Sequence, residues 1–144
     1  MKLQKVFSNG NVLNHQLYQR LRLLDEEVFF GCGNEFKDNR DWWVMLNTSG
    51  RIIAYCSCSY SDGVCIFTRA WVHKPYRGKG FQKRMIDCRI RAAKKQGCIT
   101  VITYTLHNNS YSANNLLDKG FRLYEPQYAY AGRDVIYFQK VIDG

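Results

Sequence analysis

The sequence predicts a single α/β (α+β) domain in which one mixed β-sheet carries helices on its faces. Three observations support this prediction. Helix-like and strand-like segments are interspersed along the chain, three predicted strands follow one another through tight turns, and two segments have amphipathic helical spacing. The 144 residues are about the usual size of one domain, and no linker or repeat divides them. We therefore expect residues 1–144 to fold as one unit.

The N-terminal half is predicted to contain one helix and four strands. Its strands are expected at residues 2–7, 42–46, 51–60 and 64–72. The helix is expected over 12–30, where apolar residues recur at three- and four-residue steps: Leu13, Leu17, Leu21, Leu24 and Val28. Gly31 and Gly33 then end the helix. The turn before residue 64 contains Asp62-Gly63, which favours the positive backbone angles of a tight hairpin.

The C-terminal half is predicted to alternate between helices and strands. A helix is expected over 81–96, with an apolar side formed by Phe81, Met85, Cys88 and Ala92. Residues 98–105 are rich in β-branched and aromatic types, as expected of a central strand buried on both faces. A short helix over 110–119 and two strands over 121–130 and 133–141 complete the order β-α-β-β-β-α-β-α-β-β.

Composition and cysteine spacing exclude several classes of protein. The chain is 46% hydrophobic and 15% aromatic, which argues against disorder. It has no run of roughly 18 apolar residues and no secretory signal, so we expect a soluble, cytoplasmic protein. Two of the six cysteines, Cys56 and Cys58, lie on one face of a predicted strand, and none has the paired spacing of a zinc site. We expect core thiols and no metal.

Positive charge is concentrated in one segment. The net charge is +9, and residues 74–95 contain nine Lys and Arg against the single acidic residue Asp87. Such a field raises the local concentration of anionic partners. A nucleotide cofactor, an acidic protein surface and RNA all fit this charge, as does a simple solvated helix face.

A strand, a glycine-containing loop and a helix form the strongest candidate binding unit. Gly78 and Gly80 let the backbone of the loop approach a ligand closely, and the following helix begins there with its positive dipole end. Arg77 and Lys79 add formal charge. A diphosphate fits this arrangement, whereas the alternative is an exposed flexible turn. The pattern matches neither a P-loop nor a dinucleotide-binding fingerprint.

Two segments resemble motifs of the GNAT acetyltransferases. Residues 72–82, VHKPYRGKGFQ, resemble the acyl-CoA motif Q/R-x-x-G-x-G/A that follows a strand in this family. Arg77 and Gly80 match the motif, and Gln82 departs from the small residue expected last. Residues 109–121, which end in Gly120-Phe121, resemble the family's second CoA-side motif. The resemblance extends over most of the chain, because the element order is also the GNAT order.

The resemblance implies a fold, a cofactor and a set of binding residues. The fold would be a largely antiparallel sheet of six to seven strands, splayed by a bulge between the strands at 64–72 and 98–105 to bind acyl-CoA. Backbone groups of the first strand would pair with the pantetheine arm, the loop amides would hold the diphosphate, and the last helix would line the thiol. The residues assigned to acetyl-CoA in this way are Ala70, Trp71, Val72, Arg77, Gly78, Lys79, Gly80, Phe81, Gln82, Asn109 and Ser112.

The resemblance also implies direct attack of an amine on the thioester, with a strand N–H stabilising the oxyanion. Many members have a tyrosine that protonates the leaving thiolate, and Leu116 stands at that position. Other members use a serine early in the helix, where this chain has Ser112, so Ser112 is the candidate general acid. Tyr104 and Tyr111 are weaker candidates.

No general base is evident from the sequence. Some GNAT members place a glutamate on the central strand, where this chain has Tyr104. By chemistry alone the candidates are His107, Asp62 and Glu35, and His107 lies nearest the end of the central strand. Water would serve as the general base for a reactive amine.

The sequence therefore predicts an N-acetyltransferase that transfers an acetyl group from acetyl-CoA to a primary amine of a protein, peptide or small molecule. Two alternatives stay open. The acceptor amine is RNA-bound, as in aminoacyl-tRNA, or the chain is a GNAT-fold module that binds CoA or nucleic acid with little or no turnover. Acceptor specificity is expected to lie in the first helix, the loop at 31–41 and the last hairpin.

Overall fold

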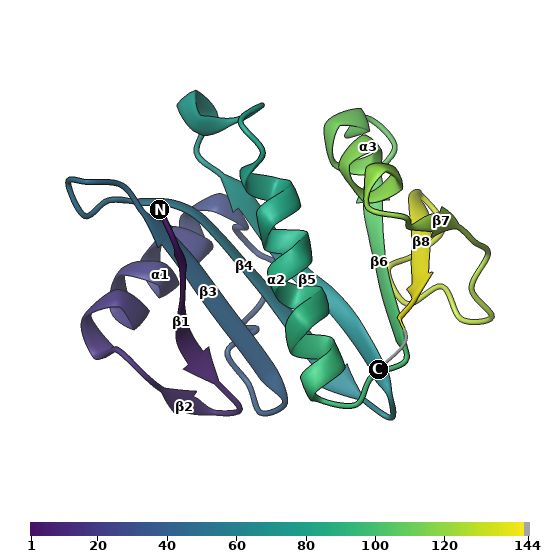
Figure 1. The fold of residues 1–144 in the computed structure, drawn as a ribbon, viewed down its shortest axis with the longest axis horizontal. Coiled ribbons are helices and arrows are strands. Elements are labelled where there is room, and N and C mark those ends of the chain that lie inside the picture. The colour runs from purple at the N-terminus through teal and green to yellow at the C-terminus, as the bar shows by residue number, and fades with distance from the viewer. Residues whose placement is uncertain (143–144) are drawn as a thin grey trace.

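The computed structural model describes residues 1–142 and contains one eight-stranded sheet of order β2-β1-β3-β4-β5-β6-β8-β7 (Figure 1). Its strands are β1 (Leu3–Ser8), β2 (Asn11–Val12), β3 (Arg40–Leu46), β4 (Ile52–Ser61), β5 (Val64–Val72), β6 (Thr100–Leu106), β7 (Arg122–Leu123) and β8 (Val135–Val141). All neighbouring strands are antiparallel except β5 and β6. The mixed, largely antiparallel sheet is confirmed, and the two-residue strand β2 is added at one edge.

Helices cover both faces of this sheet. The helices are α1 (His15–Val28), α2 (Phe81–Lys95) and α3 (Ser110–Asp118), and a 3-10 turn spans Lys74–Tyr76. Successive β3 residues show the layering, because Val44 belongs to the core cluster that contains Leu21 of α1, and Met45 to the cluster that contains Met85 of α2. Figure 1 accordingly shows α1 behind the sheet and α2 in front of it. Among residues 1–142, no helix has the length and apolarity needed to cross a membrane.

Most predicted elements lie within two residues of their observed bounds, and two differ more. The first helix begins at His15 rather than at residue 12, because Asn14 caps it through a 3.1 Å bond from the Leu17 N–H, and Val12 pairs with Phe7 in a short hairpin. The strand predicted over 121–130 is wrong beyond residue 123. Tyr124 and Tyr130 pack against Tyr137 instead, and the ring centroids of Tyr130 and Tyr137 lie 5.4 Å apart.

The predicted burial of β6 is wrong on one face. Thr103 and Thr105 are buried, whereas Tyr104 is 40% exposed and Leu106 is 56% exposed. Cys56 and Cys58 are fully buried, as predicted. The tight turn before β5 is also confirmed, with φ of 51° at Asp62.

Candidate active site

The strands β5 and β6 separate along their length. They pair at only three positions, the last being Ile66 with Ile102. On the other side of β5, Ser57 pairs with Arg69 and Cys58 with Phe67, so Thr68 is an extra residue in a β-bulge. A bulge bends its strand and increases the local twist. The end of β5 after Ile66 therefore has a free edge facing the gap, while β6 and β8 turn away from it (Figure 1).

Two adjoining pockets follow this gap. The outer pocket, about 530 Å³, is lined by Ala70, Trp71, Val72, Arg77, Gly78, Gln82, Asn109, Tyr111 and Ser112. All of these except Tyr111 were predicted to bind the cofactor. The inner pocket, about 330 Å³, shares Ala70, Gln82, Asn109 and Ser112 with it and reaches Arg89, Thr103 and Leu116. The structure thus brings together residues from β5, the loop before α2, and α3.

The loop before α2 presents backbone N–H groups at the outer pocket. Gly78 and Gly80 have φ of 76° and 85°, which L side chains rarely adopt, and a Cβ on either would meet nothing within 4 Å. Gly80 is the N-cap residue of α2, and no side chain caps this helix. The first amides of α2 therefore have no intrahelical or side-chain partner, and the positive end of the helix dipole lies with them. Such a helix end is suited to binding an anion.

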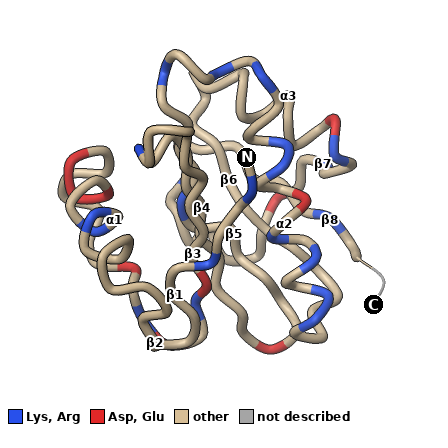
Figure 2. Tube along the Cα trace, turned by 60° about the vertical axis from the view of Figure 1, so that its left-hand side comes forward, with Lys and Arg blue, Asp and Glu red and all other residues tan. Residues whose placement is uncertain are grey.

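The charged residues of the loop add to this positive field. The Arg77 Nε donates to the Val72 carbonyl at 2.8 Å, and the Lys79 Nζ lies 5.8 Å from the Tyr76 ring centroid. Figure 2 shows Lys and Arg segments along α2 and the loop before it. The Gly78 N–H donates to the Tyr111 hydroxyl at 3.0 Å, which ties the loop to α3.

Gln82 links the two helices that border the cleft. Its Nε2 donates to the Ser112 Oγ at 3.0 Å, and its Oε1 accepts from the Asn115 Nδ2 at 2.8 Å. The Asn109 side chain caps α3 by accepting from the Ser112 N–H at 3.1 Å. Because the Ser112 Oγ accepts its bond from Gln82, its own hydrogen is free to be donated. The departure at Gln82 from the family pattern thus has a structural role.

The other candidate acids and bases lie in different surroundings. Leu116, at the position of the family tyrosine, is buried and lines the inner pocket. Tyr104 also lines this pocket but is partly exposed. His107 is exposed on the turn after β6, and Asp62 is exposed at the β4–β5 turn. The Glu35 carboxylate pairs with Arg40 at 3.2 Å. Neither pocket is lined by any of these three base candidates.

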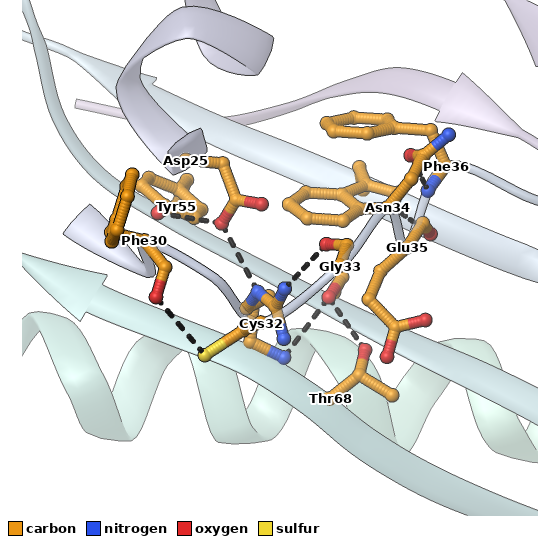
Figure 3. A network of polar contacts seen from close by, with 12 residues as sticks. Asp25, Phe30, Cys32, Gly33, Asn34, Glu35, Phe36, Tyr55 and Thr68 are labelled. Atoms are coloured by element: carbon orange, nitrogen blue, oxygen red, sulfur yellow. Dashed lines mark hydrogen bonds and ion pairs between the residues drawn. The ribbon is translucent and has the colours of Figure 1, made fainter. Parts of the chain in front are cut away.

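A buried ion pair on the α1 side of the bulge was not predicted. The Arg69 Nε lies 3.1 Å from the Asp25 carboxylate, and its Nη2 donates to the Gly33 carbonyl at 3.1 Å. Asp25 also accepts from the Tyr55 hydroxyl at 2.9 Å, and burial together with this carboxylate raises the pKa of Tyr55. Figure 3 shows how Asp25, Tyr55 and Gly33 converge there. The network fixes the end of α1 and the following loop against β5.

Arg89 is a second buried arginine that the sequence analysis missed. It is 2% exposed, and its guanidinium carbon lies 3.8 Å from the ring centroid of Phe67. Its position, four residues after Met85 and four before Ala93, puts it on the buried face of α2. This spacing was the one sequence feature that could have predicted the burial of Arg89. Burial raises the pKa of the Cys56 thiol to about 12, and the positive charge of Arg89 opposes this shift.

Comparisons with known proteins agree with this geometry. A model of the acetyltransferase (GNAT) family matches residues 6–121. Similar solved structures include a GNAT-family acetyltransferase from Staphylococcus aureus Mu50 (TM-score 0.72, 13% identity, 99% of this chain and 100% of that chain) and Tetrahymena GCN5 (0.70, 14%, 96% and 96%). A Bacillus anthracis protein assigned as a streptothricin acetyltransferase, solved with acetyl coenzyme A, is also similar (0.63, 22%, 73% and 64%). No curated protein matches the sequence.

The match to the family model covers most of the chain, so the protein belongs to the GNAT acetyltransferase family. Members of this family use acetyl-CoA as co-substrate. At the identities above, the likeness to solved structures is one of fold.

Proposed function

We propose that this protein is an acetyl-CoA-dependent N-acyltransferase that acts on a primary amine. The observation that carries the proposal is the uncapped N-terminus of α2, which opens beside the unpaired edge of β5. A cofactor with a diphosphate at one end and an amide-containing arm at the other needs these two features side by side.

The residues of the cleft fit such a cofactor. Gly78 and Gly80 carry no side chain that would separate a ligand from the loop backbone, and the space where a Cβ would stand is empty to 4 Å at both. The α2 amides would hold the diphosphate, with Arg77 and Lys79 supplying charge. Backbone groups of Ala70 to Val72 would pair with the arm. Bound acetyl-CoA supplies an acyl group activated as a thioester.

Two groups of the protein, one on β5 and one on α3, would support acyl transfer from opposite sides of the gap between β5 and β6. An N–H of β5 beside the bulge is the donor for the thioester oxygen. The Ser112 hydroxyl, which lines both pockets, holds a hydrogen that it can donate toward sulfur. The amine would enter from the α1 side, where the Asp25–Arg69 pair fixes the loop after α1. Since no candidate base lines the pockets, water takes the amine proton.

An acyl-transfer assay tests this proposal. The purified protein is incubated with acetyl-CoA and separate panels of small amines, peptides and aminoacyl-tRNA, and release of free thiol is followed. We expect thiol release that depends on one of these acceptors. Binding of acetyl-CoA without release for any acceptor class would contradict the enzymatic proposal and favour a binding module.

A further inference from the structure

Arg89 carries a buried positive charge with no acidic partner. Its three hydrogen bonds run from Nε to the Met85 carbonyl at 3.1 Å and from Nη1 to the Ser57 and Arg69 carbonyls at 3.4 Å each. Among residues 1–142 no carboxylate lies within 4.0 Å of it, and no protein group accepts from Nη2. An arginine guanidinium stays charged in proteins, and a buried charge without a counter-ion destabilises a fold.

This charge borders the inner pocket. Arg89 lies on the α2 wall, and the β6 wall contributes Thr105, whose buried Oγ1 has no hydrogen-bond partner in the described chain. Buried polar groups are usually paired, so the unpartnered Thr105 hydroxyl on one wall and the Arg89 Nη2, which has no protein acceptor, on the other indicate a missing polar ligand. An anionic oxygen would satisfy both, because both can donate a hydrogen bond.

The position of Arg89 indicates which part of a ligand would reach it. Gln82 lines both pockets, and Arg89 lies seven residues further along α2, a rise of roughly 10 Å. Its Nη1 already binds the Arg69 carbonyl beside the bulge. The guanidinium therefore lies deeper in the cleft than the arm-binding residues. It lies toward the end of the cleft at Ile66, where β5 and β6 are paired.

We infer that the inner pocket accepts an acyl group that ends in a carboxylate, such as a succinyl group, and that Arg89 and Thr105 bind this carboxylate. The inference rests on the proposed acyl-CoA function and adds the acyl chain to it. The acetyl group is still transferred. The inferred preference is for a longer acyl chain with a terminal carboxylate over a neutral chain of the same length. Selectivity arises because a neutral chain leaves the buried charge of Arg89 without a partner.

The transfer is the same reaction as with an acetyl group. The bond between the acceptor nitrogen and the acyl carbon forms, and the bond from that carbon to sulfur breaks with its electron pair on sulfur. Sulfur gains a proton from the Ser112 hydroxyl, the amine loses one to water, and a proton from water then restores the Ser112 hydroxyl. The distal carboxylate is unchanged and leaves on the product.

Binding of succinyl-CoA is compared with that of butyryl-CoA, its neutral four-carbon counterpart, by titration calorimetry. We expect the wild-type protein to bind succinyl-CoA about tenfold more tightly. In Arg89→Met this ratio should fall to about one, while Arg89→Lys should keep part of it. Arg91→Met, an exposed position on the same helix, should keep the wild-type ratio.

The ratio of the two affinities is measured within each variant, so a smaller fraction of folded protein lowers both affinities equally and leaves the ratio unchanged. Thr105→Val, which keeps side-chain shape and leaves α2 untouched, should lower the ratio about threefold. Equal binding of both ligands by the wild type would overturn the inference, as would a loss in Arg89→Met that is the same for acetyl-CoA, butyryl-CoA and succinyl-CoA. Absence of binding by CoA itself would instead reject the proposed function.

Discussion

The N-termini of α2 and α3 both border the cleft, yet their backbone amides are treated differently. Asn109 caps α3 and accepts from an amide of its first turn, whereas α2 begins at Gly80 in a left-handed conformation with no side-chain cap. A cap satisfies amides internally and stabilises the helix. Leaving them free costs stability and keeps an anion site open. Under the proposed function, the amides of α2 would bind the diphosphate, whereas the capped amides of α3 would not take part in anion binding.

The two helices also differ at their C-terminal ends, and in α2 that end offsets the missing N-terminal cap. The last turn of α2 carries Lys94 and Lys95, which complement its dipole, and its buried face carries Met85 and Ile86. The α3 helix has no basic residue in its last turn. Stability of α2 therefore comes from packing and from its C-terminal end, so its N-terminus is free for a ligand.

Placing a negative charge at the N-terminus of α2 should have the largest effect on CoA binding. In Gly80→Asp, the carboxylate would compete for the free amides and repel a diphosphate, so CoA affinity should fall roughly a hundredfold or more. Titration calorimetry measures this loss. Gly97→Asp is the matched control, because Gly97 has a similar φ of 78° at the opposite end of α2. An equal loss of affinity in the control would mean that backbone strain, not the anion site, caused the effect.

Removing the hydroxyl at the α3 end should have an intermediate effect on turnover. In Ser112→Ala, no hydrogen is donated toward sulfur, so kcat should fall about tenfold to a hundredfold while CoA affinity changes little. Steady-state kinetics with a reactive amine separate kcat from binding. Unchanged kcat would show that Ser112 is not the acid.

Removing the α3 cap should have the smallest effect on catalysis and a measurable one on folding. Asn109→Ala should lower the free energy of unfolding by about 1 kcal/mol. Asn14→Ala in α1 removes a cap of the same 3.1 Å geometry far from the cleft and should cost a similar amount. Denaturant unfolding compares the two. If Asn109→Ala weakens CoA binding as much as Gly80→Asp does, the contrast between the two helix ends is wrong.

The region from β5 through α2 was predictable from the sequence, because its signals are local. The glycines at 78 and 80 and the apolar spacing after them give the loop and helix within one residue of the observed bounds. The segment 124–134 was not predictable in this way. Its tyrosines have strand propensity, but in the structure Tyr124 and Tyr130 pack on Tyr137, whose hydroxyl donates to the Gly132 carbonyl at 2.6 Å.

The inner part of the cleft depends on contacts distant in sequence, so its bulge was predicted only from the family resemblance and its buried arginines were missed. Thr68 becomes a bulge residue through its register against β4, and nothing in residues 64–72 marks it. Arg69 pairs with Asp25, 44 positions away along the chain. A charged residue on a strand reads as exposed unless its partner is known. The spacing of Arg89 from Met85 and Ala93 indicated a buried position on α2. The pocket beside it, however, exists only because β5 and β6 separate.

The central claim is that the uncapped α2 end binds the diphosphate of CoA, and thermal unfolding with added ligand tests it most directly. With free CoA at a hundredfold excess over its dissociation constant, the account predicts stabilisation of about 2.7 kcal/mol, seen as a rise in Tm. ATP and NAD at the same concentration should give little or no rise. An unchanged Tm with millimolar CoA, or an equal rise with ATP and NAD, would contradict the account.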